Sequence, residues 1–192
     1  VEPAQKGTRN VLQQASATDS VRRVVVTSSC AAIYGDNADL EHIAGDEFTE
    51  DHWNTTSTLD HQPYSYSKML AEREAWKIAD AQDRWDLVTI NPSLVIGPGI
   101  NPNATSESYK LMKQFGDGSM KAGVPDYGVG VVDVRDVANA HFAAAFNASA
   151  SGRHIVSACN TSFPEFAASS ARILTVTIRF PNALSQSGWS GC

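Results

Sequence analysis

A tyrosine and a lysine four residues apart are the first residues of this 192-residue sequence whose spacing suits chemistry. Tyr64 and Lys68 lie in the stretch HQPYSYSKMLAEREAW, where Pro63 favours the first turn of a helix that would carry both side chains on one side. A neighbouring ammonium favours the phenolate and lowers the pKa of a tyrosine, which suits that hydroxyl for proton transfer. Tyr109 and Lys113 have the same spacing, so the pattern alone does not separate a catalytic pair from a surface pair.

The segments around these pairs alternate between helix-like and strand-like patterns. A helix is predicted over residues 7–17, a buried strand over residues 21–29 and a second helix over residues 63–79. Another strand is predicted over residues 87–90, with Pro92 and a Gly/Pro turn ending it. This order predicts an α/β fold in which helices cover both faces of a parallel sheet.

The later part of the sequence continues this alternation. A helix is predicted over residues 106–115, another after Asp133, and a strand over residues 153–158. Ser162 and Glu165 have the spacing of a capping box, which predicts the start of a further helix.

The predicted strand ends favour one of the two tyrosines. In open α/β sheets, ligands bind at the carboxyl ends of the strands. Tyr64 opens the helix that follows a strand ending in small hydroxyl side chains, whereas Tyr109 follows an irregular stretch. We therefore expect Tyr64 to be the tyrosine of a functional site.

Composition and charge exclude several classes of protein. The chain is 42% hydrophobic and 19% charged, with a formal net charge of −6, so we expect no nucleic-acid partner and no anionic membrane surface. No apolar run is long enough to cross a membrane. Three widely spaced cysteines and five scattered histidines form no ligand motif, so no metal is expected and a reducing, cytoplasmic location is favoured.

Five motifs, in this order, resemble those of a known superfamily: KGTRNVL, RRVVVTSSCAAIYG, PYSYSKMLAE, NPSLVIGPG and VDVRDVANAH. Over about residues 1–166 the sequence resembles the extended short-chain dehydrogenase/reductases, the NAD-dependent epimerase/dehydratase superfamily. FTEDHWN and NPSLVIGPG make it most similar to dihydroflavonol reductases, cinnamoyl-CoA reductases and fungal methylglyoxal or ketone reductases. The resemblance implies a partial Rossmann-like, doubly wound parallel sheet with remnants of a small C-terminal substrate lobe.

The resemblance also implies roles for individual residues. Tyr64 matches the catalytic tyrosine of the family, Lys68 its lysine and Ser29 its catalytic serine. Ser28 is the alternative serine, because a count back from the IYG end shifts the alignment by about one position. The cofactor implied is NADP, with NAD as the alternative, and the residues implied to bind it are Thr27, Ser28, Tyr64, Lys68, Pro92, Ser93, Leu94 and Val95.

Two parts of the sequence depart from the family's pattern. The glycine-rich phosphate loop G-x-x-G-x-x-G has no match, so we expect the N-terminal phosphate-loop part of the fold to be missing. Residues 167–192 do not resemble the substrate lobe; a shifted reading frame or a mis-spliced gene model would explain them, and a divergent tail is the alternative. We assign residues 1–98 and 128–158 to a Rossmann-like NAD(P)-binding domain, and residues 99–127 and 159–192 to substrate-lobe elements.

The function that the resemblance implies is the NAD(P)H-dependent reduction of a carbonyl compound, an aldehyde or a ketone, to an alcohol. The expected partner is this small-molecule substrate, and the expected state is a monomer or homodimer. A sugar-nucleotide epimerase or dehydratase would use the same tyrosine and lysine, and a truncated, non-catalytic binding protein is the third hypothesis. The sequence leaves open the identity of the substrate and the activity of a chain without a phosphate loop.

Overall fold

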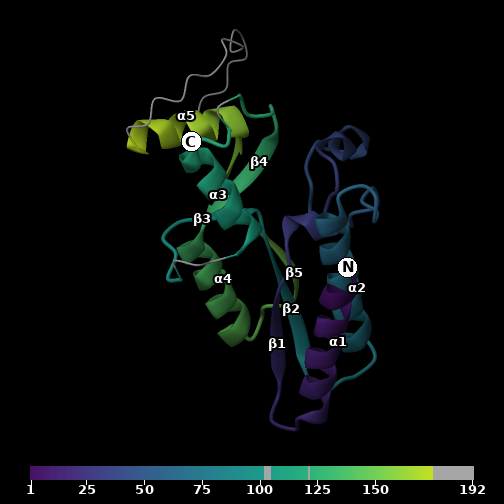
Figure 1. Ribbon diagram of the computed structural model, residues 1–192. Coiled ribbons are helices and arrows are strands. Elements are labelled where there is room, and N and C mark those ends of the chain that lie inside the picture. Colours follow the sequence, from purple (N-terminus) through teal and green to yellow (C-terminus); the bar gives the residue numbers. More distant parts are fainter. Residues whose placement is uncertain (102–104, 121, 175–192) are drawn as a thin grey trace. The chain divides into compact units, whose positions relative to one another are not determined.

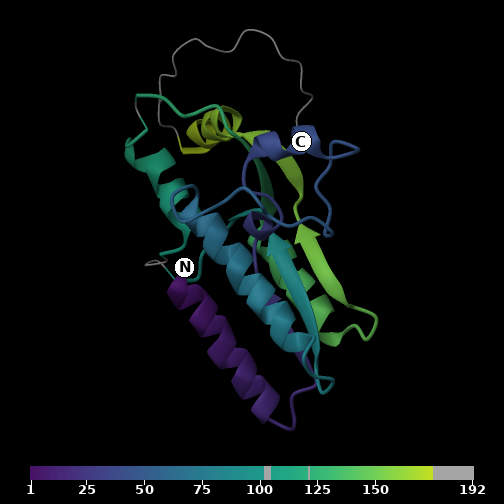
Figure 2. The same ribbon diagram turned by 90° about the vertical axis from the view of Figure 1, so that its right-hand side faces the viewer.

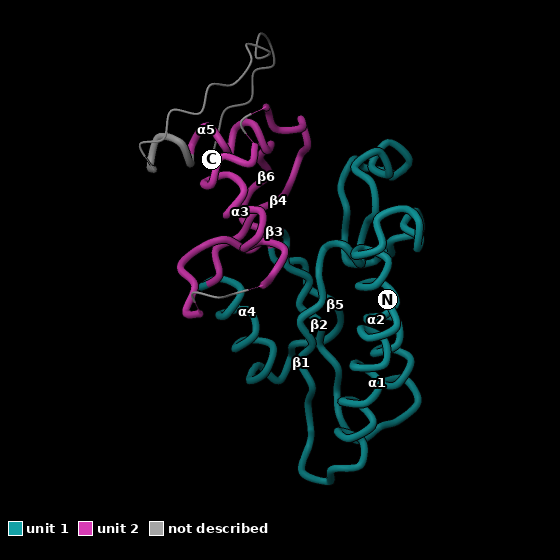
Figure 3. Tube along the Cα trace, viewed as in Figure 1, with its two compact units in different colours: residues 1–93, 135–156 teal, residues 94–134, 157–192 magenta. Residues whose placement is uncertain are grey.

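The computed structural model describes residues 1–101, 105–120 and 122–174. Contacts divide the chain into two compact units (Figure 3): residues 1–93 and 135–156 form the first unit, and residues 94–134 and 157–192 the second. The roles predicted for a cofactor domain and a substrate lobe stay predictions. The predictions about the C-terminal tail fall mostly on residues 175–192, which lie outside the described residues.

A three-stranded parallel sheet forms the centre of the first unit. Its order is β1 (Arg23–Thr27), β2 (Asp86–Pro92) and β5 (Gly152–Val156), with β2 in the middle. All six residues of β2 from Leu87 to Pro92 are buried, as expected for a strand covered on both faces.

Helices cover both faces of this sheet (Figures 1 and 2). α1 (Glu2–Ala17) and α2 (Pro63–Ala79) lie side by side on one face, and α4 (Val134–Phe146) lies on the other. The expected α/β fold with a Rossmann-like parallel sheet is therefore confirmed.

Successive side chains of β2 point to opposite faces of the sheet, so the strand contributes residues to the core on each face. Leu87 packs with Leu12 and Ala75 beneath α1 and α2. Val88 and Ile90 belong to the core on the side of α4.

One buried asparagine, Asn54, stabilises the segment between β1 and α2. This segment contains two short 3-10 helices, η1 (Cys30–Ala32) and η2 (Asn37–His42). Asn54 is 1% exposed; its Nδ2 donates to the Ala31 carbonyl at 2.8 Å, and its backbone N–H donates to the Ala32 carbonyl at 3.0 Å. These bonds hold the long loop against the turn that follows β1.

The second unit has its own small sheet. β3 (Leu94–Ile96) pairs in parallel with β4 (Gly128–Asp133), and β4 pairs antiparallel with β6 (Cys159–Ser162). β3 was not predicted, because a three-residue apolar run directly after a strand gives no separate periodic signal.

Two helices pack together in this unit, α3 (Glu107–Asp117) and α5 (Phe163–Leu174). The Phe115 ring of α3 lies 5.9 Å from the Phe163 ring and 5.4 Å from the Phe166 ring, between centroids. Aromatic packing therefore joins the two helices.

The predicted capping box at the start of α5 is confirmed. The Glu165 backbone N–H donates to Ser162 Oγ at 3.3 Å, and the Ser162 backbone N–H donates to Glu165 Oε2 at 3.1 Å.

Two further findings concern the described residues as a whole. Within residues 1–101, 105–120 and 122–174, no helix has the length and apolarity needed to cross a membrane. The same residues contain no group of three or more histidine, cysteine or acidic side chains that could hold a metal ion.

Candidate active site

The first turns of α2 place Tyr64 and Lys68 beside each other. Lys68 Nζ lies 5.9 Å from the centroid of the Tyr64 ring, as the four-residue spacing predicts. Burial lowers the pKa of the Lys68 ammonium below its ordinary 10.5, whereas Tyr64 is 50% exposed. A half-exposed phenol next to a partly desolvated ammonium has the access and the charge environment that proton exchange with a bound molecule requires.

The start of α2 is held in an uncommon backbone conformation. Gln62, which precedes the helix, has φ 54°, in the left-handed region that non-glycine residues seldom adopt. Gln62 Nε2 donates to Asp36 Oδ1 at 2.5 Å, and His61 Nε2 lies 2.8 Å from Asp36 Oδ2. Such strain persists where the surrounding contacts hold it, and here it lies two residues before Tyr64.

The two candidate serines have different environments. Ser28 is 8% exposed, and its Oγ donates to the Glu72 carboxylate. Ser29 caps η1: its Oγ accepts from the Ala31 backbone N–H at 3.1 Å, which leaves its own O–H proton for another acceptor. α2 packs against η1, so this turn lies next to the helix that carries Tyr64.

The Thr27 side chain forms a hydrogen bond on the face of the sheet that α4 covers. Its Oγ1 lies 2.7 Å from His141 Nε2, and His141 Nδ1 lies 2.8 Å from the Val137 carbonyl oxygen. Because a carbonyl oxygen only accepts, Nδ1 carries a proton, and in the neutral imidazole Nε2 then accepts from the Thr27 hydroxyl. His141 therefore orients Thr27 at the end of β1.

The four remaining residues predicted to bind the cofactor fall in both units. Pro92 is the last residue of β2, and the backbone N–H of Ser93 donates to the Val156 carbonyl at 3.1 Å in the first unit. Leu94 and Val95 lie on β3 of the second unit.

Tyr109 also belongs to the second unit. It lies in the first turn of α3, where its backbone N–H donates to the capping Ser106 Oγ at 3.2 Å. The first unit thus contains the serine-capped turn together with Tyr64 and Lys68, whereas Tyr109 lies on the aromatic-packed helix α3.

Sequence reasoning missed a buried polar cluster in the first unit. Glu72 of α2 contacts Ser28, Thr89, Asn91 and Arg153. One signal was available: Glu72 follows Lys68 by four residues, so the helix places it one turn further on the same side. The partners could not be found by spacing, since Ser28 directly follows β1 and the other partners lie on β2 and β5.

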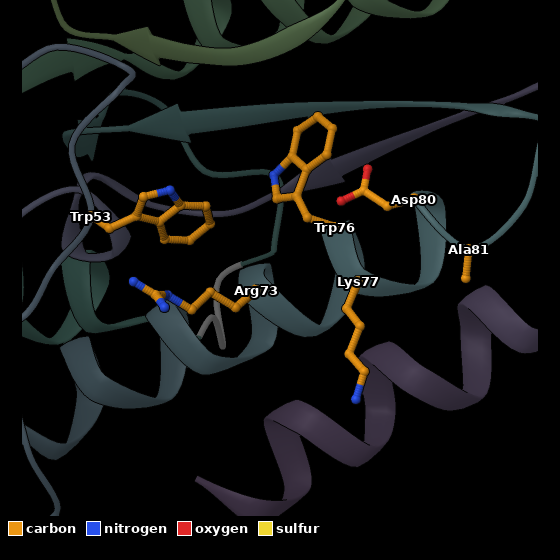
Figure 4. Close-up of a pocket in the computed structure, with 6 residues that line it drawn as sticks. All are labelled: Trp53, Arg73, Trp76, Lys77, Asp80 and Ala81. Atoms are coloured by element: carbon orange, nitrogen blue, oxygen red, sulfur yellow. The ribbon is translucent and has the colours of Figure 1, made fainter.

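A surface cavity of about 640 Å³, wide open to solvent, is also present in the first unit (Figure 4). The Arg73 guanidinium lies 4.9 Å from the centroid of the Trp53 ring, and Trp76 Nε1 is buried with no hydrogen-bond partner among the described residues. The cavity lining contains none of the predicted catalytic residues, so it gives no support to the predicted site; the lining residues are Trp53, Arg73, Trp76, Lys77, Asp80 and Ala81.

Comparison with known proteins shows the family to which the chain belongs. The model of the NAD dependent epimerase/dehydratase family matches residues 2–158. A cinnamoyl-CoA reductase of Medicago truncatula is 40% identical over 157 residues, which are 80% of this chain and 46% of the relative. An anthocyanidin reductase of Vitis vinifera is 35% identical over 175 residues, 87% of this chain and 52% of the relative.

A solved structure has the same fold. The yeast methylglyoxal/isovaleraldehyde reductase, in complex with NADPH, has a TM-score of 0.73 at 28% identity, covering 92% of this chain and 56% of that chain. The chain thus spans about half the length of the curated relatives that it matches. The family match covers most of the chain, and the chain therefore belongs to the NAD dependent epimerase/dehydratase family.

Proposed function

We propose that this chain carries the catalytic residues of an NADPH-dependent reductase that converts an aldehyde or a ketone to an alcohol. The observation that carries the proposal is the Tyr64–Lys68 pair on α2, with the Lys68 ammonium 5.9 Å from the centroid of the Tyr64 ring. The turn capped by Ser29 packs against the same helix.

The three side chains supply the proton and the stabilising charges and hydrogen bonds that carbonyl reduction uses. Negative charge grows on the carbonyl oxygen during the reaction, and Tyr64 donates the proton that neutralises it. The positive charge of the Lys68 ammonium favours the phenolate that remains after the proton has left. Ser29 donates a hydrogen bond to the same oxygen, a contribution of about 3 kcal/mol by analogy with one oxyanion donor.

The residues at the ends of β1 and β2 fit the nicotinamide end of the cofactor. When bound, NADPH supplies the hydride. Thr27, Pro92 and Ser93 lie at these strand ends, where ligands of open α/β sheets bind. Lys68 has ammonium protons that suit a ribose hydroxyl.

The environment of the two serines supports Ser29 as the catalytic one. The Ser28 hydroxyl proton is used in its bond to Glu72, inside the core. A hydroxyl that already donates to a buried carboxylate is a poor donor to a substrate.

The relatives support reduction over sugar-nucleotide chemistry. The matched plant proteins named as cinnamoyl-CoA and anthocyanidin reductases are 35–40% identical. A UDP-glucose 4-epimerase of Thermus thermophilus is 22% identical, a likeness of fold alone.

The test is a turnover assay with the purified chain. NADPH is supplied with a panel of aromatic and aliphatic aldehydes, and UDP-glucose is offered with NAD in parallel. We expect loss of reduced nicotinamide matched by formation of the alcohol. Interconversion of the sugar nucleotide would instead support the epimerase hypothesis, and a folded chain without either activity would support the binding protein.

A further inference from the structure

A buried ion pair lies one helical turn beyond Lys68. Glu72 Oε1 is 2.6 Å from Arg153 Nε, and the two side chains are 0% and 8% exposed. Burying two charges is unfavourable unless their remaining donors and acceptors are bonded. Arg153 Nη1 meets this need by donating to the carbonyl oxygens of Glu50 at 2.7 Å and His52 at 2.5 Å.

The second carboxylate oxygen of Glu72 contacts the ends of two strands. Oε2 accepts a hydrogen bond from Ser28 Oγ, and another from Asn91 Nδ2 at 2.7 Å. Thr89 Oγ1 lies 3.4 Å from Oε1. Because strand side chains alternate, these residues all face α2, and one carboxylate therefore connects that helix to β1, β2 and β5.

The same bonds continue to the backbone on both sides of the Ser29 side chain. Asn91 Nδ2 lies 3.2 Å from the Ser29 carbonyl oxygen, and Arg153 Nη2 lies 3.4 Å from the Ala32 carbonyl oxygen. Ser28, the residue before Ser29, is bonded directly to Glu72. The turn that Ser29 caps is thus bonded to Glu72 and to the partners of Glu72.

We propose that Glu72 is a positioning residue for the Ser29 hydroxyl: its carboxylate fixes the end of β1 and the following turn against the helix that carries Tyr64 and Lys68. The proposal rests on the proposed function, since it assigns Ser29 and Tyr64 to one reaction. Glu72 acts through Asn91 and the backbone and does not touch the substrate.

A second buried glutamate of α2 provides the matched control. Glu74 is 8% exposed, and its Oε1 pairs with Arg9 Nε of α1 at 2.7 Å. Glu72→Gln and Glu74→Gln make the same chemical change on the same helix, and each breaks a pair with an arginine. Of the two glutamates, Glu72 is the one whose hydrogen bonds lead to Ser29. Glu72→Gln should therefore disturb Ser29, and Glu74→Gln should not.

The first measurement needs no activity. Backbone amide resonances of Ser29, Cys30 and Ala31 are compared in the wild-type chain, Glu72→Gln, Glu74→Gln and Asn91→Ala. We expect these three resonances to move in Glu72→Gln and Asn91→Ala, and to stay in place in Glu74→Gln, which should move resonances of α1. Asn91→Ala leaves the ion pair intact, so it carries the test if Glu72→Gln does not fold.

The second measurement is turnover of the same variants. We expect Glu72→Gln to lower kcat by about 10²-fold, as misplacement of a reacting group by about 1 Å does, while Glu74→Gln keeps kcat within about twofold. Unmoved amides in Glu72→Gln and Asn91→Ala, or wild-type kcat in folded Glu72→Gln, would overturn the proposal. An inactive wild-type chain would instead contradict the proposed function, and the amide comparison would still test the positioning.

Discussion

At the scale of single residues, burial makes Lys68 unlike an ordinary surface lysine. Its ammonium is partly removed from water one turn away from Tyr64, and burial lowers its pKa. Sequence spacing predicted this neighbour relation, because a helix brings residues four apart together. The burial could not be predicted, since it depends on the segments that fold over α2.

The lowered pKa of Lys68 makes the stability of the chain depend on pH in one direction. Between the folded-state pKa and 10.5, the unfolded chain binds the proton more tightly, so stability rises with pH across that window. We expect the free energy of unfolding of the wild type, relative to Lys68→Met, to increase as pH approaches 10.5. Urea unfolding of both proteins at several alkaline pH values tests this, and a difference that is independent of pH would contradict it.

Cys30 is predicted to be inert in the folded chain. Burial, with smaller contributions from the charges of Glu50 and Glu72, raises the pKa of its thiol from the ordinary 9.0 to about 12. This lowers the thiolate fraction at pH 8 by roughly 10³-fold, and the thiolate is the reactive form. Alkylation followed by peptide mass spectrometry should leave Cys30 unmodified in the native protein and modify it in guanidinium chloride. Rapid modification of Cys30 in the native protein would contradict this account.

At the scale of elements, a contact within one turn of chain could be predicted from the sequence, whereas a contact between distant segments could not. The capping box of Ser162 and Glu165 appears as predicted, because both partners lie within one turn of chain. The pairing of Glu72 with Arg153 spans 81 residues, and no spacing rule covers that distance. The predicted helix over residues 7–17 begins earlier, at Glu2, because Pro3 is accommodated in its first turn.

The loop before α2 depends on a glycine at position 35. A Cβ at Gly35 would lie 2.2 Å from Thr56 Oγ1 and 2.8 Å from Asn54 Oδ1. The Asn54 amide is bonded to the Ala31 carbonyl, so it cannot move freely. We expect Gly35→Ala to lower the free energy of unfolding by about 1–3 kcal/mol, measured by urea denaturation.

Gly7 of α1 is the control for this prediction. A Cβ at Gly7 would meet no atom within 4 Å, and alanine is the better helix former. Gly7→Ala should therefore raise stability by about 0.5–1 kcal/mol. If both substitutions changed the free energy of unfolding equally, the loop would have to move enough to relieve the crowding at Gly35, which would contradict the prediction.

At the scale of the whole molecule, the family is established by the match over residues 2–158 and the fold by the parallel sheet. The chain spans about half the length of its curated relatives, and no G-x-x-G-x-x-G phosphate loop occurs in its sequence. The parallel sheet and the motif order were predictable because each motif carries its own local pattern. The predictions about residues 175–192 concern a stretch outside the described residues and stay predictions.

The central claim is that Tyr64 donates the proton in carbonyl reduction, and one pair of variants tests it directly. Tyr64→Phe keeps the ring and removes the hydroxyl, while Tyr109→Phe makes the same change on α3. With circular dichroism to confirm folding, we predict that Tyr64→Phe lowers the turnover number with NADPH and an aldehyde by about 10²–10⁴-fold, and that Tyr109→Phe keeps most of it. A folded Tyr64→Phe protein with near-wild-type turnover would contradict the account.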